Sequence, residues 1–131
     1  MIKTMGLTHI ALQVADVNRS LEFYKKVFGV KEMYIYEHFI QVQTPGTNDI
    51  IVFETGNEKT PPIKIGFHFG FRLTKPSTID KLIHIIEAAG GTIKDSGEFV
   101  PEEPYVFFYD PDGYEIEVWF ENIPETHGEF N

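Results

Sequence analysis

Two histidines and one glutamate have the types and positions that a metal site needs. His9 and His68 lie 59 residues apart (68 − 9), and each opens a stretch of alternating apolar and polar residues that precedes a helical pattern. Glu117 lies in a later alternating stretch and shares one face of it with Glu115 and Glu121. Two imidazoles and a carboxylate suit a divalent transition metal and leave open positions for substrate or water.

The histidines and the glutamate could instead have ordinary structural roles. A lone strand histidine is more often a satisfied core residue, and a row of acids is more often a solvated outer face. The matching positions of His9 and His68 in two similar halves of the chain, together with Glu117, favour the metal site. We expect the other acids of that strand to be solvated and the other histidines to lie outside the site: Glu115, Glu121, His38, His84 and His127.

The first half of the chain predicts a strand, a helix and three further strands. Thr8–Val14 alternates, with His9 on its polar face. Asp16 is a suitable N-cap for a helix over Arg19–Phe28, which Gly29 ends. The three strand patterns that follow are Lys31–Tyr36, Phe39–Gln43 and Ile50–Glu54.

The second half repeats this order. Phe67–Leu73 alternates, with His68 on its polar face, and Ser77 or Thr78 can cap a helix that runs to Ala89. Strand patterns follow at Thr92–Phe99, Tyr105–Asp110 and Gly113–Phe120. The repeat predicts an α+β fold of two tandem βαβββ modules in one domain. Module one covers about residues 5–56 and module two about 64–122, with a linker at about 57–63 and a flexible tail at 123–131.

A tight turn at Asp110-Pro111-Asp112-Gly113 precedes the last strand. If the apolar residues of each first and last strand pack on the helices, then His9, His68 and Glu117 face the concave side of a curved sheet. The turn fixes the register, because a slip of one residue would exchange Glu117 for Ile116 on that side.

At this level of detail the sequence resembles the vicinal oxygen chelate superfamily of glyoxalases, bleomycin resistance proteins and extradiol dioxygenases. The resemblance covers roughly residues 5–122. The resemblance rests on four parts of the sequence: Thr8–Val14, the pairs Phe23-Tyr24 and Phe28-Gly29 that follow it, His68, and Asp110–Glu117. It implies two modules that curve into an open barrel with the helices outside. It also implies that His9, His68 and Glu117 bind a divalent transition metal: nickel, zinc, iron, manganese or cobalt.

Two further residues, Glu54 and Arg72, are candidate site residues, and each has more than one possible role. Glyoxalase-like members use a carboxylate near the end of the first module's last strand, which suggests Glu54. Strict alignment with the second half instead places Val52 opposite Glu117, so Glu54 is a ligand, a catalytic base or an acid at the rim of the site. Arg72 shares the His68 face and is suited either to a substrate carboxylate or phosphate, or to an ion pair with a nearby acid.

The resemblance leaves three functions open. The first is a glyoxalase-like lyase or isomerase that chelates vicinal oxygens of a small substrate while a carboxylate such as Glu54 moves a proton. The second is an extradiol-type dioxygenase, and the third is a metal-free drug-binding protein of the bleomycin-resistance type. The family also implies a homodimer, with the site either within one chain or shared across the interface.

The amino-acid composition of the chain excludes several classes of binding partner and site. A formal net charge of −9 with scattered basic residues argues against nucleic acid, and the absence of cysteine excludes thiolate ligands and cysteine nucleophiles. No apolar run reaches membrane-spanning length, and the first residues lack the pattern of a signal peptide. We therefore expect a cytoplasmic protein that acts on a small molecule.

Overall fold

The computed structural model describes residues 1–56 and 66–122, so the predicted linker and tail lie outside the described residues. Module one contains β1 (His9–Val14), α1 (Val17–Phe28), β2 (Lys31–Ile35), β3 (Phe39–Gln43) and β4 (Ile50–Thr55). Module two contains β5 (Phe69–Arg72), α2 (Ile79–Ala88), β6 (Thr92–Glu98), β7 (Pro104–Tyr109) and β8 (Glu115–Trp119). The predicted α+β class and the duplicated order are confirmed.

Each module forms one four-stranded mixed sheet. The strand orders are β1-β4-β3-β2 and β5-β8-β7-β6, and in each sheet the first strand runs parallel to the last strand of its module. The register pairs Ala11 with Val52 in module one and Gly70 with Glu117 in module two. The two halves therefore match in topology, and Val52 is the structural counterpart of Glu117.

Local sequence explains where the helices begin and end. The Asp16 side chain accepts hydrogen bonds from the N–H groups of Asn18 and Arg19, and Thr78 caps α2 by accepting from Lys81 N–H. Gly29 ends α1 with φ 68°, a left-handed conformation that glycine adopts without steric cost. Both predicted helices are confirmed to within two residues at each end.

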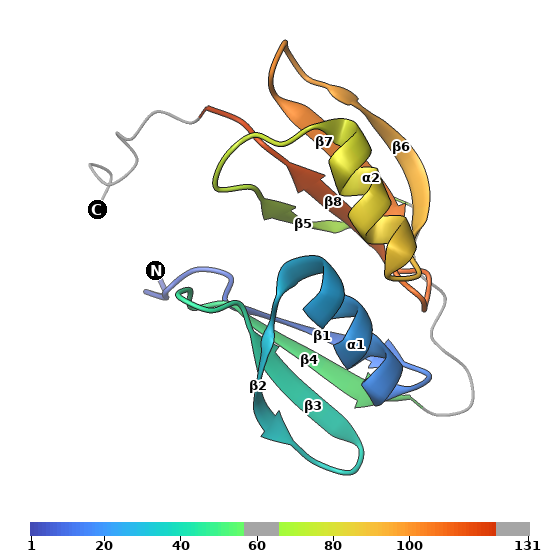
Figure 1. Ribbon diagram of the computed structural model, residues 1–131. Coiled ribbons are helices and arrows are strands. Elements are labelled where there is room, and N and C mark those ends of the chain that lie inside the picture. The colour runs from blue at the N-terminus through green and yellow to red at the C-terminus, as the bar shows by residue number, and fades with distance from the viewer. Residues whose placement is uncertain (57–65, 123–131) are drawn as a thin grey trace.

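The two modules share one hydrophobic core. α1 packs on β3 and β4, α2 packs on β6 and β7, and each helix is drawn in front of its own sheet in Figure 1. Aromatic rings join the modules: Phe28 of α1 stacks on Phe71 of β5 with centroids 3.8 Å apart, and Phe23 contacts Phe108 of β7. This packing holds the sheets at a defined relative position.

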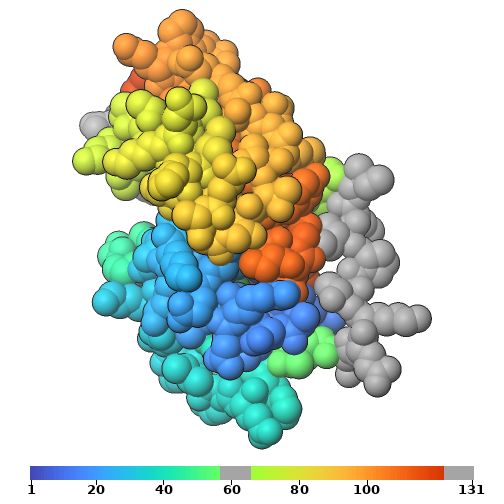
Figure 2. Space-filling model, turned by 45° about the vertical axis from the view of Figure 1, so that its right-hand side comes forward, coloured from blue at the N-terminus to red at the C-terminus, as the bar shows by residue number. Residues whose placement is uncertain are grey.

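A polar joint also links the modules, at the turn before β8. The Asp112 carboxylate accepts hydrogen bonds from Ala15 N–H (2.9 Å), Arg19 Nη2 (2.8 Å) and Ser20 Oγ (3.3 Å). Tyr114 Oη donates to the carbonyl of Gln13 at 2.7 Å. Figure 2 shows the orange atoms of module two seated on the blue atoms of module one. The turn was expected only to set a register, but it also attaches β8 to the strand that carries His9.

Behind this joint lies a buried hydrogen bond between the modules. Tyr24 Oη donates to Asp110 Oδ2 at 2.7 Å, while Asp110 Oδ1 accepts from the N–H groups of Asp112 and Tyr114. Burial raises the pKa of Asp110, although these donors oppose the shift, and burial raises the pKa of Tyr24 still further. Behind the more exposed contacts of the joint, Tyr24 and Asp110 are therefore buried polar groups that satisfy each other.

Candidate metal centre

Each sheet has a face covered by its helix and an opposite face, which we call the uncovered face. In β8, Ile116 and Val118 are buried on the helix side, so the intervening Glu117 points to the uncovered face. In β1, Leu12 and Val14 are buried in the same way, and His9 lies on the exposed alternate positions. The predicted assignment of faces is therefore confirmed in both modules.

His68 and Glu117 lie next to each other on the uncovered face of module two. His68 Nε2 lies 3.5 Å from Glu117 Oε1, and their side chains are 38% and 15% exposed. Burial raises the pKa of the Glu117 carboxyl, and the neighbouring His68 partly opposes that shift. His68 directly precedes β5, one residue earlier than the strand start. An imidazole and a carboxylate at this separation can bind one divalent metal.

Glu115 was expected to be a solvated acid, but the structure buries it to 8% exposure. Its Oε1 accepts a hydrogen bond from Lys94 Nζ at 2.8 Å, and its Oε2 lies 3.9 Å from His68 Nδ1. The hydrogen bond to Glu115 raises the pKa of Lys94. The two ring nitrogens of His68 therefore face two different carboxylates.

A bulge explains how Lys94 reaches this position. The pairing of β6 with β7 shifts register on either side of Lys94, and such an extra residue re-aims its side chain. In the sequence, the only indication of this arrangement was that Glu115 shares a strand face with Glu117. Nothing in the spacing identified Lys94 as its partner.

Two aromatic rings, from β7 and β8, lie near the His68–Glu117 pair. Phe107 of β7 packs edge-on against His68, with ring centroids 5.3 Å apart. Trp119 lies over Gly70, where an added Cβ would be only 2.5 Å from the Trp119 ring, so a side chain at that position would displace the tryptophan. These rings form an apolar wall beside the polar pair.

His9 is not grouped with the other two predicted ligands. It lies at the start of β1 and lines a small cavity between β1, β4 and β5. Within residues 1–56 and 66–122, no three histidine, aspartate or glutamate side chains come close enough together to hold one ion. One chain therefore brings together two of the three predicted metal donors.

Glu54 and Arg72 lie near the ends of their strands. Glu54 is exposed and pairs in register with Gln13, two residues beyond Val52, which occupies the position of Glu117 in the other module. Arg72 is exposed at the end of β5 and pairs in register with Trp119. Among the described residues, neither side chain forms an ion pair or hydrogen bond with the His68–Glu117 pair.

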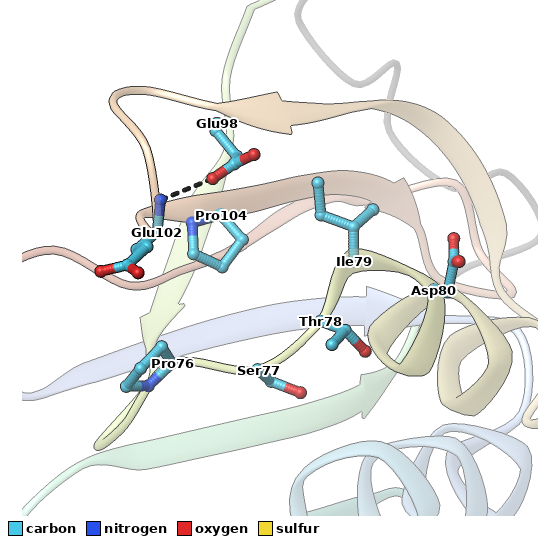
Figure 3. A pocket seen from close by; sticks show the side chains of 8 residues that line it. All are labelled: Pro76, Ser77, Thr78, Ile79, Asp80, Glu98, Glu102 and Pro104. Carbon is cyan, nitrogen blue, oxygen red and sulfur yellow. Dashed lines mark hydrogen bonds between the residues drawn. The ribbon is translucent and has the colours of Figure 1, made fainter.

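Another hollow lies at the N-terminal end of α2 and the β6–β7 loop (Figure 3). Glu102 has a left-handed backbone there (φ 73°), and its N–H donates to Glu98 Oε2 at 2.6 Å. None of the predicted site residues lines this hollow. Its lining is Pro76, Ser77, Thr78, Ile79, Asp80, Glu98, Glu102 and Pro104.

Comparison with known proteins finds sequence similarity to lactoylglutathione lyases. The chain is 28% identical over 124 residues to lactoylglutathione lyase GLX1 of Arabidopsis thaliana, covering 84% of this chain but only 42% of that protein's length. It is 28% identical over 123 residues to the lactoylglutathione lyase of Escherichia coli O157:H7, covering 87% of this chain and 91% of the relative. These relatives are named as enzymes.

Among solved structures, the fosfomycin resistance protein FosX of Listeria monocytogenes is similar with a TM-score of 0.76 and 25% identity, over 94% of this chain and 97% of that one. A point mutant of that protein, solved with Mn(II) and 1S,2S-dihydroxypropylphosphonic acid, has the same fold with a TM-score of 0.77.

Within the described residues of the present chain, no helix is long and apolar enough to cross a membrane.

The family model for the glyoxalase/bleomycin resistance protein/dioxygenase superfamily matches residues 6–118, which is most of the chain. That range contains both modules, the His68–Glu117 pair and the joint at Asp112. This chain belongs to the glyoxalase/bleomycin resistance protein/dioxygenase superfamily.

Proposed function

We propose that this protein is a metal-dependent enzyme of the glyoxalase-like type, which binds adjacent oxygens of a small substrate to a divalent transition metal. The observation that carries the proposal is the approach of His68 Nε2 to Glu117 Oε1 at 3.5 Å on the uncovered face of module two. Nickel, zinc, iron, manganese and cobalt all accept such donors. The similarity to lactoylglutathione lyases and to a FosX structure solved with Mn(II) supports this assignment.

The third ligand in this proposal is His9 of a second copy of the chain. One chain presents His68 and Glu117 on module two and His9 on module one, and these groups do not meet within the described residues. A two-fold homodimer that faces module one of each copy with module two of the other contains two complete sites. Exposed apolar side chains support such an interface: Met33, Tyr34, Ile35, Tyr36, Phe67, Phe99 and Val100.

The residues of the chain have separate tasks in this mechanism. His68 and Glu117, with His9 of a second copy, would hold the metal, which would supply Lewis-acid stabilisation of negative charge on the substrate oxygens. Glu54, exposed near the end of β4, moves a proton at the neighbouring carbon, and Arg72 receives an anionic group of the substrate. Phe107 and Trp119 keep water from one side of the site.

Metal analysis tests the proposal. Protein purified without chelator is expected to carry about one divalent metal per chain, as a mononuclear site requires. His68→Ala should lose it, whereas the control His84→Ala, on the exposed face of α2, should retain it. Equal and very low metal contents in all three proteins would contradict the metal-dependent activity and favour a metal-free binding protein.

Mixed dimers test the shared site. A His9→Ala chain paired with a His68→Ala chain has one ruined site and one site with all its ligands, if the ligands come from two copies. Each variant alone should bind no metal, while the purified mixed dimer should regain about half of the wild-type content. A mixed dimer without metal would instead require that each site forms within one chain.

A second candidate function is dioxygen activation on Fe(II). Val52 stands at the position of Glu117 in module one, so the proposed donor set is two histidines and one carboxylate. That set is typical of non-haem iron oxygenases. Oxygen uptake by the Fe(II)-loaded protein with a catechol would favour this candidate, and isomerisation of an α-oxo thiohemiacetal without oxygen uptake would favour the first.

A further inference from the structure

We propose that Glu115, held in place by Lys94, is a positioning residue that orients His68 so that its Nε2 is the metal-binding nitrogen. The inference rests on the proposed function, because it concerns how one of the proposed ligands is held. It assigns a role to two residues that the sequence did not connect with the site.

The contacts form a continuous chain from solvent to the proposed metal position. Lys94 Nζ donates to Glu115 Oε1 at 2.8 Å, and the other carboxylate oxygen lies 3.9 Å from His68 Nδ1. On the opposite side of the ring, His68 Nε2 faces Glu117 Oε1 at 3.5 Å. Each oxygen of Glu115 thus faces a different nitrogen-bearing side chain.

Because Glu115 is buried, its contacts with Lys94 and His68 matter for its stability. The Glu115 side chain is 9% exposed, whereas Lys94 is 43% exposed and reaches inward from the bulge in β6. A buried carboxylate needs compensating partners, and Lys94 supplies one without occupying the oxygen that faces His68. The ion pair therefore fixes Glu115 while leaving one acceptor directed at the imidazole.

Two acceptors on the Nδ1 side of the His68 ring, the Gly66 carbonyl and Glu115, bias its tautomer. The Gly66 carbonyl lies 3.3 Å from His68 Nδ1 and only accepts, so it favours a proton on that nitrogen, whereas Glu117 Oε1, 3.5 Å from Nε2, is the competing acceptor in metal-free protein. Glu115 adds a negatively charged acceptor on the same side of the ring. A proton held on Nδ1 leaves the Nε2 lone pair free beside Glu117, as a metal-binding imidazole requires.

The tautomer can be measured in metal-free protein. Nitrogen-15 chemical shifts of the His68 ring should show a proton on Nδ1 in the wild type, and Glu115→Ala should shift the equilibrium toward a proton on Nε2. Glu115→Gln keeps a carbonyl acceptor and should retain more of the wild-type tautomer, so it tests the contact if Glu115→Ala does not fold. Glu103→Ala, which removes a carboxylate bound to Asn122 instead, is the matched control.

Titration with Co(II) alone provides the second measurement. Loss of the outer partner of a histidine ligand costs about 10- to 100-fold in metal affinity, so Glu115→Ala should fall in that range and Glu115→Gln should lose less. Lys94→Met should also weaken binding, because it releases Glu115 from its position.

The possible results separate the two proposals. If the wild type binds Co(II) and both Glu115 variants match it in affinity and in tautomer, the positioning role is wrong and the metal site stands. If the wild type binds no Co(II), the proposed function fails, and an unchanged tautomer in Glu115→Ala would then overturn the positioning role as well. A weaker affinity with a changed tautomer supports both.

Discussion

Modules one and two have the same order of elements and the same sheet topology, yet their uncovered faces carry different side chains. Module two places Glu117 opposite Gly70, whereas module one places Val52 opposite Ala11. Module two therefore holds the adjacent His68 and Glu117 with the Lys94–Glu115 pair beside them, while in our proposal module one supplies His9 as a ligand and Glu54 as the base. The two halves share one backbone topology, but the side chains at equivalent positions of their uncovered faces differ.

The second difference concerns the ends of the same strands. Glu54 in β4 and Trp119 in β8 occupy equivalent register positions, two residues beyond Val52 and Glu117 respectively. An exposed carboxylate in one module thus corresponds to a large ring in the other. In a dimer that joins unlike modules, each site would receive one acid and one apolar wall.

The largest effect is expected from removing the carboxylate that distinguishes module two. Glu117→Ala should weaken divalent metal binding by more than about 100-fold, which exceeds the cost of losing an outer partner of a ligand. Adding Val52→Glu to this variant should restore part of the affinity, because it places a carboxylate at the equivalent position of module one. Isothermal titration with Co(II) measures both, and wild-type affinity in Glu117→Ala would exclude it as a ligand.

Breaking the joint between the modules should have the next largest effect. Asp112 is 2% exposed and accepts three hydrogen bonds from module one. Asp112→Ala should lower the free energy of unfolding by about 2 kcal/mol, as expected for hydrogen bonds to a charged group. Arg19 is 47% exposed, so Arg19→Ala should cost less than about 1 kcal/mol. Urea unfolding compares the two, and equal losses would show that Asp112 acts only through Arg19.

The close packing at Gly70 offers a third comparison between the modules. Gly70→Ala puts a methyl group 2.5 Å from the Trp119 ring and should cost about 1–3 kcal/mol through overpacking. Ala11→Gly, the counterpart in module one, should cost only about 0.5–1 kcal/mol. Trp119 is the single tryptophan, so its fluorescence reports the displacement directly. An unchanged emission spectrum in Gly70→Ala would contradict the contact.

The elements of both modules could be predicted from sequence because their determinants are local. Asp16 and Gly29 lie next to the helix that they delimit, and the alternation of Thr8–Val14 directly gives the buried face of β1. The placement of Glu117 on the uncovered face followed from the same alternation. These features need no knowledge of distant contacts.

The remaining features depend on contacts between distant parts of the chain. The buried Glu115 is paired with Lys94, which lies at a bulge in β6, and alternation alone cannot show a bulge. Asp112 bonds to Ala15, 97 residues earlier, so the joint has no local pattern. The position of His9 relative to His68 depends on the packing of whole modules and, in our proposal, on a second copy.

A smaller effect is expected from the buried acid behind the joint. Burial raises the pKa of Asp110 in the folded protein above its unfolded value of about 3.9. Between these two pKa values the folded state holds a proton that the unfolded state releases, so stability falls as pH rises through this window. Asp110→Asn keeps a polar partner for Tyr24 and should remove that slope. Urea unfolding from about pH 4 upward measures it, and identical slopes in both proteins would contradict the assignment.

The smallest effect on metal binding is expected at Glu54, which tests how far the two modules differ. Its register position matches Trp119 and not Glu117, so we assign it to proton transfer instead of metal ligation. Glu54→Gln should change Co(II) affinity by less than about threefold, or about 0.7 kcal/mol, while turnover falls by about 100-fold or more. A loss of affinity as large as that of Glu117→Ala would show instead that the strand end bends inward, so that both modules supply a carboxylate ligand to each site.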